Sequence, residues 1–174
     1  MSSKVLLLLC FIHFANAGDW LHVGQAAVGA KDNSYHELVY KGPSSFVGAV
    51  KLVHTKGYMS NRKGLTNSYW GLVNESQVLA TVITDVENRI IYPSPFVTQL
   101  TWHGLYRMPG YNSTSPYLVF SDFCAPQYFE GGRKIRIWYS EDLYDYTDHN
   151  NNGTSHMEVY FFLYGNRKAK LQNN

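Results

Sequence analysis

Segments in which apolar and polar residues alternate one by one fill the chain after residue 18, and no other feature constrains the fold as strongly. Successive side chains of a β-strand point to opposite faces, so this alternation indicates a strand with one buried face. In residues 134–140, for example, Ile135, Ile137 and Tyr139 share one face. The same period predicts strands at Phe46–His54, Ser68–Val73, Val78–Thr84, Arg89–Tyr92, Val97–Trp102, Tyr117–Phe123, Lys134–Ser140 and Met157–Tyr164.

The residues between these segments indicate how the strands assemble. Breaks rich in Pro, Gly and Asn separate them, and no window carries the i, i+3, i+4 apolar stripe of a helix. The 14 Tyr, 9 Phe and 4 Trp also favour strands and contact surfaces. We therefore predict an all-β protein, a single antiparallel β-sandwich of jelly-roll-like form. Its core should contain Ile135, Ile137, Tyr139, Val159 and Phe161.

Residues 1–17 have the layout of a secretory signal peptide. Lys4 precedes a short apolar run, Val5–Ile12, and Ala15-Asn16-Ala17 follows as a cleavage site. The apolar run is about half as long as the roughly 20 residues that a membrane-spanning helix needs. We expect cleavage after Ala17, secretion to the extracellular space, one domain over residues 18–174 and no membrane span.

The cysteines and glycosylation sequons fit a secreted protein only in part. Cys10 leaves with the signal peptide, so Cys124 stands alone and no intrachain disulfide can form. Cys124 is then either a buried thiol, which its position at a strand end favours, or a bridge to another chain. Sequons for N-glycosylation begin at Asn74, Asn112 and Asn152, each between predicted strands.

The segment from Ser140 to Glu158 is the strongest candidate for a metal site. It holds five carboxylates, a run of three Asn and no Lys or Arg. Ca²⁺ takes about six to eight oxygen ligands of these kinds. An EF-hand is excluded, because the twelfth position counted from Asp148 is Val159. Calcium would then be held in a hairpin loop, with Asp142, Asp145, Asp148 and Asn150 as the predicted ligands. The alternative is a solvated acidic loop without metal.

Aromatic side chains beside polar groups indicate a second kind of site. Trp138 shares a strand face with Arg136, and Tyr144 lies in the acidic segment. Sugar rings stack on aromatic faces while their hydroxyl groups bond to neighbouring polar side chains. Trp138, Arg136 and Tyr144 are thus the predicted glycan-binding residues. The alternative is that the aromatic rings pack within the sandwich.

The sequence contains no arrangement of residues typical of catalysis. Its His residues lack metal-site spacing, and it has neither a nucleophile elbow nor a phosphate-binding glycine loop. The net charge of +2 is too small to indicate a nucleic-acid partner. We predict a secreted, non-enzymatic binding module for an extracellular glycan, with calcium or without it. The alternative is a structural protein of an extracellular or skeletal organic matrix, acting by self-association or matrix contact.

One segment, Ile137-Trp138-Tyr139-Ser140-Glu141-Asp142-Leu143, is the most specific of a set of short motifs. The others are Gly48–His54, Gly57–Ser60, Val82–Asp85, Pro109–Tyr111, Ser115–Phe120 and Val159-Tyr160. Together, over roughly residues 46–162, they resemble a family of secreted extracellular domains from cnidarians such as corals and hydroids. The resemblance implies a secreted, cysteine-paired domain and no particular activity. This chain departs from the pattern, because members carry cysteines near the positions of Asn61, Leu72 and His156.

Overall fold

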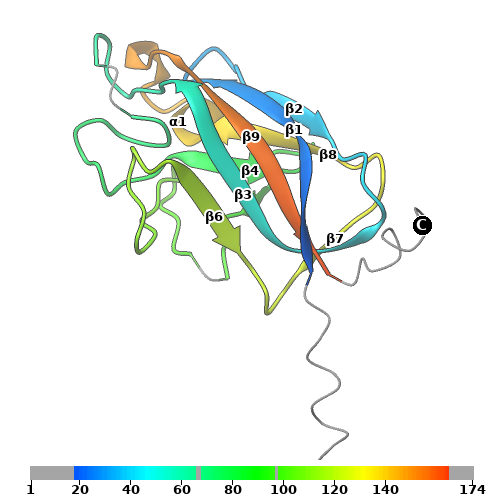
Figure 1. Ribbon diagram of the computed structural model, residues 1–174. Helices are drawn as coiled ribbons and strands as arrows, with labels where there is room; N and C mark the ends of the chain where they lie inside the picture. The colour runs from blue at the N-terminus through cyan, green and yellow to red at the C-terminus, as the bar shows by residue number, and fades with distance from the viewer. Residues whose placement is uncertain (1–17, 66–67, 97, 165–174) are drawn as a thin grey trace, which may run out of the picture.

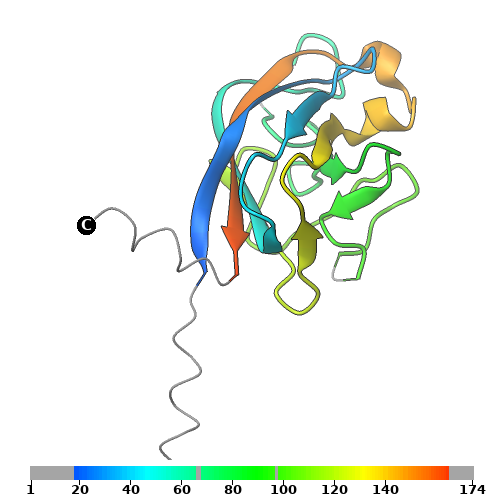
Figure 2. The same ribbon diagram turned by 90° about the vertical axis from the view of Figure 1, so that its right-hand side faces the viewer.

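Two antiparallel sheets lie face to face in the computed structural model, which describes residues 18–65, 68–96 and 98–164 (Figure 2). The predicted signal peptide, residues 1–17, lies outside the described residues. The prediction of an all-β antiparallel sandwich is confirmed.

The larger sheet contains the three longest strands: β1 at its edge, and β9 and β3 in its interior. Its order is β1-β9-β3-β6, and β7 also pairs with β3 (Figure 1). The bounds are β1 Asp19–Gly29, β9 Thr154–Leu163, β3 Ser45–Gly57, β6 Tyr117–Ser121 and β7 Gln127–Phe129. Bulges interrupt the pairing of β1 and β3 with β9, and bulges increase the local twist of a sheet.

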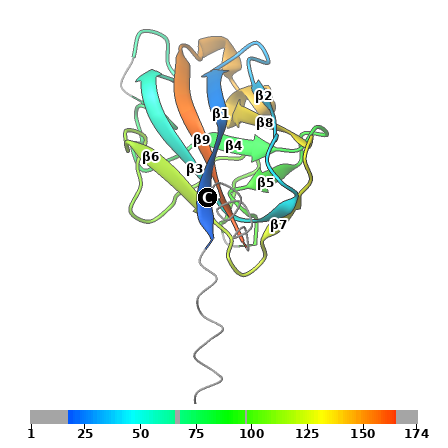
Figure 3. The same cartoon turned by 45° about the vertical axis from the view of Figure 1, so that its right-hand side comes forward.

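The smaller sheet lies behind the first in Figure 3, in the order β2-β8-β4-β5. Its strands are β2 His36–Val39, β8 Lys134–Tyr139, β4 Thr81–Thr84 and β5 Ile90–Tyr92. The strand β8 is central, since it pairs with β2 on one side and with β4 on the other. From β8 the chain passes to the first sheet through α1 (Ser140–Leu143) and the 3-10 helix η2 (Asp148–Asn150).

The core between the two sheets has the composition that the alternation predicts. Buried side chains of both sheets form one hydrophobic cluster, and the five predicted core residues, Ile135, Ile137, Tyr139, Val159 and Phe161, all belong to it. Each of the five is fully buried. The prediction of the core around β8 and β9 is therefore confirmed.

Several strand predictions were wrong, and side-chain burial explains why. Residues 68–73 and the described part of 97–102 form no strand. In the first segment Trp70 and Leu72 are buried on an irregular backbone. This backbone is tied to its neighbours by the isolated bridge of Gly71 to Leu79 and by a hydrogen bond from Thr81 Oγ1 to the Trp70 carbonyl. The alternation of this segment therefore reflects side-chain burial and not pairing of the backbone into a β-strand. Conversely, β1, β2 and β7 were missed: a bulge between His22 and Gly24 breaks the alternation of β1, and β2 and β7 are short.

The prediction that the Cys124 thiol is buried was also wrong, because Cys124 is exposed. The strand β6 ends at Ser121, and residues 122–125 form a turn before β7. A side chain in this turn lies beyond the sheet and outside the core. Among the described residues, no helix is both long and apolar enough to cross a membrane.

Candidate functional site

One end of the sandwich is closed by the segment that runs from α1 through η2 to the start of β9. Asp142 anchors this segment: its carboxylate accepts hydrogen bonds from the backbone N–H groups of Asn33 (2.8 Å) and Ser34 (2.9 Å) in the turn between β1 and β2. Burial raises the pKa of the Asp142 carboxyl, the two hydrogen bonds oppose the rise, and the charges of Asp148 and Asp145 add to it. The three predicted acidic ligands thus lie close enough to interact.

The acidic segment does not present a ready set of metal ligands. Within the part of the chain that the structure describes, no group of three or more His, Cys, Asp or Glu is arranged to hold a metal ion. Asp145 is exposed, Asp148 is half-buried and Asp142 is buried. Asp145 and Thr147 both have a left-handed φ of about 50°. That conformation is costly for a β-branched residue such as Thr, so the loop is locally strained.

Buried oxygen acceptors without hydrogen-bond donors lie beside this cluster. Glu141 is 4% exposed and Asn151 is 3% exposed. Among the described residues, no donor reaches Oε2 of Glu141, Oδ1 of Asn151 or Oδ1 of Asn150. The Asn151 side-chain N–H donates to the Ala30 carbonyl at 3.0 Å, which fixes the direction of its amide. Buried polar atoms without a partner are rare, and an ion or ordered water is one explanation for them.

The carboxyl of Glu141 is the most perturbed acid in this region. Burial raises its pKa to about 7, and the neighbouring Asn151 side chain partly opposes the rise. A carboxyl buried in this way favours its neutral form unless a cation compensates its charge. The sequence placed Glu141 in the acidic segment but did not single it out.

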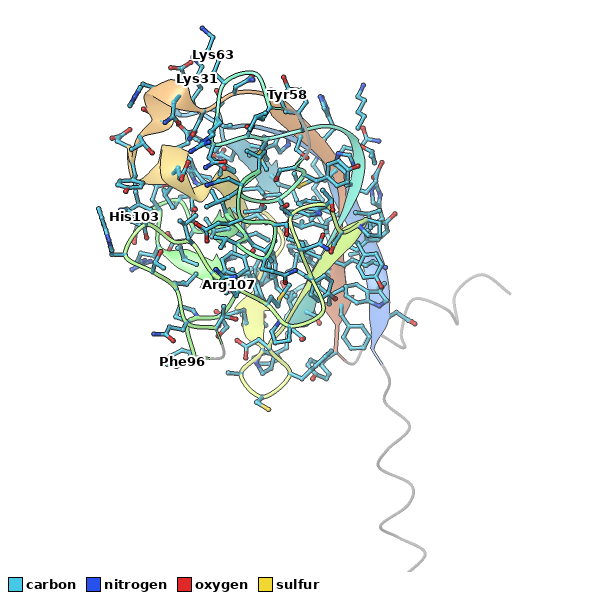
Figure 4. All side chains as sticks on the ribbon, turned by 90° about the vertical axis from the view of Figure 1, so that its left-hand side faces the viewer. Lys31, Tyr58, Lys63, Phe96, His103 and Arg107 are labelled. Atoms are coloured by element: carbon cyan, nitrogen blue, oxygen red, sulfur yellow. The ribbon has the colours of Figure 1, made fainter. Side chains whose placement is uncertain are left out.

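An aromatic group lies directly against the acidic segment, and part of it was not foreseen. Trp102 is 74% exposed and meets the Tyr146 ring edge to face, with centroids 5.3 Å apart. The same Tyr146 ring stacks on His103 at 3.5 Å. Figure 4 shows His103 on the side of the molecule where α1 and η2 lie. Tyr144, a predicted glycan-binding residue, belongs to this group and is exposed.

Gly104 allows this close approach. Its φ of +73° is left-handed, and a Cβ at this position would meet the Tyr144 ring at 3.0 Å and the Ser140 Cβ at 3.1 Å. Glycine is favoured where the backbone needs both a positive φ and space. The turn that carries Trp102 can thus pack against α1. The sequence indicated this turn through Gly104, which directly follows Trp102 and His103. The turn was not predicted, because Val97–Trp102 was interpreted as a strand.

The other two predicted glycan-binding residues are covered by the sandwich's own side chains. Trp138 is 2% exposed, because the Tyr35 ring packs on it with centroids 4.3 Å apart. The Arg136 guanidinium lies 4.8 Å from the same Tyr35 ring and donates to Asn88 Oδ1 at 2.9 Å. The expectation that Trp138 lies on an open face was wrong. In this arrangement a sugar cannot stack on its ring, and Tyr144 is the one predicted residue that stays accessible for stacking.

The three sequons occupy loops, as expected from the strand pattern. Asn74 is exposed, whereas Asn112 and Asn152 are half-buried. Asn112 Oδ1 accepts a hydrogen bond from the Thr114 backbone N–H at 2.9 Å, and Asn152 Oδ1 accepts one from the Tyr58 hydroxyl at 3.4 Å. Asn74 is therefore the most open of the three positions.

Exposed aromatic rings and an exposed carboxylate thus lie together at one end of the sandwich. No protein-family model matches the chain, and no curated protein matches it in sequence. A solved structure does resemble it: AJLec from the sea anemone Anthopleura japonica, whose name designates a lectin. The TM-score is 0.76 at 25% sequence identity, and the match covers 84% of this chain and 98% of AJLec. The match supports a cnidarian-type domain and is consistent with a carbohydrate-binding module.

Proposed function

We propose that this protein is a secreted, non-enzymatic carbohydrate-binding module whose sugar site lies at the end of the sandwich formed by α1, η2 and the Trp102 turn. The observation that carries the proposal is the similarity in fold to a lectin over almost the whole length of that lectin. The presence of exposed aromatic rings beside carboxylates supports the choice of this end.

The site would bind the apolar face of a sugar ring and the hydroxyl groups of the sugar with different side chains. The exposed Trp102 indole and the Tyr144 ring offer apolar faces for the C–H side of a pyranose ring. Asp145 and Asp148 offer carboxylate oxygens for its hydroxyl groups, and charge-assisted hydrogen bonds of this kind are strong. The left-handed backbone at Asp145 and Thr147 keeps the segment between α1 and η2 compact.

Calcium is the cofactor that this chemistry fits, with Asp142, Asp145, Asp148 and Asn150 as its proposed ligands. Asp142 retains acceptor capacity, because each carboxylate oxygen has two lone pairs and each accepts one backbone N–H. The donor-free oxygens of Asn150 and the neighbouring Glu141 support a cation at this end. When bound, calcium would supply positive charge to the acidic segment and open coordination positions for sugar hydroxyls.

Secretion and N-glycosylation remain proposals that rest on the sequence. Residues 1–17 carry the features of a signal peptide, and Asn74 is an exposed sequon in the folded chain. The extracellular space is also where a glycan-binding module would meet its ligands.

The function can be tested with a glycan array probed by the secreted protein in millimolar calcium and then in excess chelator. The proposal predicts binding to a restricted set of glycans, and the calcium proposal predicts that chelator removes it. Equal binding under both conditions would contradict the role of calcium and leave carbohydrate binding intact. No binding to any glycan would contradict the function itself.

A second candidate function, contact with an extracellular matrix, is favoured by one surface. The outer face of the larger sheet carries a group of aromatic rings beside one lysine. Trp20 packs against Phe162 with centroids 5.5 Å apart, and Phe123 packs against the same ring at 5.5 Å. The Lys51 ammonium lies 4.6 Å from the Trp20 ring centroid. Exposed aromatic faces are typical of contact surfaces, so self-association through this face is the alternative to sugar binding.

A further inference from the structure

A cleft of about 480 Å³ opens beside the turn that carries Trp102. Its apolar lining includes Leu72, Val78 and Tyr106, which are all buried. Its polar lining includes Glu75, Gln99 and Arg107, which are exposed. Small-molecule sites are usually concave and mostly apolar with a few polar groups, and they range from about 300 to 1,000 Å³. The cleft has the size and the mixed lining of such a site.

An ion pair at the cleft restricts the charge of its ligand. Arg107 Nη2 lies 3.2 Å from Glu75 Oε2, and both side chains are more than half exposed. The carboxylate disfavours an anion and the guanidinium disfavours a cation. Together they offer an acceptor and several donors side by side, which suits neighbouring hydroxyl groups. A neutral, polyhydroxylated ring with one apolar face meets all these conditions, and a pyranose is such a ring.

The cleft and the proposed sugar site share one turn of the chain. Thr101 N–H donates to the Leu105 carbonyl at 2.8 Å, and Leu105 N–H donates to Thr101 Oγ1 at 3.1 Å. These two bonds close a turn whose tip is Trp102 and His103, while Thr101 and Leu105 line the cleft. Arg107 lies further along the same loop from His103 (Figure 4). A ligand that stacks on Trp102 therefore lies next to the cleft.

We infer that the cleft is a second sugar subsite, and that the ligand is a neutral oligosaccharide extending from the Trp102 ring into it. This inference rests on the proposed function, because the first sugar is the one that stacks on Trp102. The subsite contains no predicted calcium ligand, so its contacts require no metal.

The test removes the charges of the cleft as a pair. The double variant Glu75→Ala/Arg107→Ala leaves neither charge without its partner. Glu87→Ala is the control, because it removes an exposed carboxylate from the turn between β4 and β5 and leaves Arg89 paired with Asp85 at 2.7 Å. All proteins carry Ser76→Ala, which removes the sequon at Asn74 beside the cleft without changing Asn74 itself. Affinities are then measured for the best neutral oligosaccharide from the array and for its terminal monosaccharide.

Compared with the protein that keeps both charges, the cleft variant should bind the oligosaccharide about tenfold more weakly. Its affinity for the monosaccharide should stay within about twofold. The control should change neither affinity by more than about twofold. In amide NMR spectra, the oligosaccharide should shift Leu72, Leu105 and Arg107, and the monosaccharide should not. Unchanged oligosaccharide affinity in the cleft variant, or no shift at these amides, would overturn the inference while leaving carbohydrate binding in place. Failure of every sugar to bind would instead overturn the proposed function together with the inference.

Discussion

Ile137 is the residue whose environment was predicted most completely. It lies on the central strand β8, where it pairs with His36 of β2 and with Ile83 of β4. Its side chain is fully buried in the core. Alternation along a strand assigns a side chain to a face, and the apolar neighbours at every second position assign that face to the core.

Ile137→Ala should therefore destabilise the protein by about 2–5 kcal/mol, the usual cost of truncating a buried aliphatic side chain. Denaturation by urea measures this free energy of unfolding. Val86→Ala is a suitable control, because Val86 is exposed in the turn after β4 and should change stability by about 0.5 kcal/mol or less. Equal losses in the two variants would place Ile137 outside the core.

Glu141 makes stability depend on pH in an unusual direction. The folded pKa of about 7 lies above the ordinary value of 4.5, so the folded state binds the proton more tightly than the unfolded state. Stability should then fall as pH rises between these two values, by at most about 3.5 kcal/mol at roughly 1.4 kcal/mol per pKa unit. With chelator present, Glu141→Gln should lose this dependence, and the exposed control Glu130→Gln should keep it. Urea denaturation across this pH range would contradict the assignment if Glu141→Gln and the unmodified protein followed the same curve.

Cys124 offers a direct check of the turn between β6 and β7. Because its thiol is exposed, it should react with a maleimide in the folded chain 18–174 after mild reduction, without denaturant. Mass spectrometry counts the added label. Reaction only after unfolding would mean that this side chain is buried, as the sequence had suggested.

At the scale of elements, the proposed role of calcium depends on the segment from α1 to η2. The charges of Asp145 and Asp148 act on Asp142, donor-free oxygens belong to the same segment, and a bound cation would offset the repulsion between the carboxylates. If calcium binds only the folded state, it should stabilise the protein by about 2.7 kcal/mol at a hundredfold excess over Kd. Magnesium should substitute poorly, because it gives up its water reluctantly.

Thermal unfolding in millimolar calcium and in chelator measures this effect. Asp145→Asn should reduce the shift in Tm, and Asp32→Asn should preserve it. Asp32 is an exposed carboxylate in the turn between β1 and β2, and Asn tolerates its positive φ of 62°. Identical melting temperatures in calcium and in chelator would leave a solvated acidic loop as the correct interpretation.

The elements also show where sequence patterns succeed and where they fail. Regular strands with large apolar residues, such as β8 and β9, could be located from alternation alone, because their pleat and their burial coincide. The exposure of Trp138 could not be predicted this way. Its side chain lies on the assigned face of the strand, but Tyr35 from a loop covers it. Trp102 was missed for the related reason that a turn closed by Thr101 and Leu105 has no period. The acidic segment could be recognised from its composition. The burial of Glu141 could not, because it depends on contacts between elements that are distant in the sequence.

At the scale of the whole molecule, two aromatic surfaces compete for the role of ligand site. One is the end of the sandwich, where Trp102 is 74% exposed beside the acidic segment. The other is the outer face of the larger sheet, where Trp20 is 40% exposed and Lys51 lies over its ring. The first surface has the exposed carboxylate of Asp145 next to its rings. On the second surface the Glu158 carboxylate already pairs with His22 and accepts a hydrogen bond from Gln25. Sugar recognition needs both kinds of group, and this favours the end of the sandwich.

The central claim, that carbohydrate binds at the Trp102 end, is tested most directly by probing one glycan array with three proteins. These are the unmodified protein, Trp102→Ala and Trp20→Ala, each in millimolar calcium. The two variants remove the same side chain from the two competing surfaces, so one serves as the control for the other. We expect Trp102→Ala to lose about tenfold or more in affinity for every bound glycan, and Trp20→Ala to bind like the unmodified protein. Retained binding by Trp102→Ala, or binding by none of the three proteins, would contradict the account.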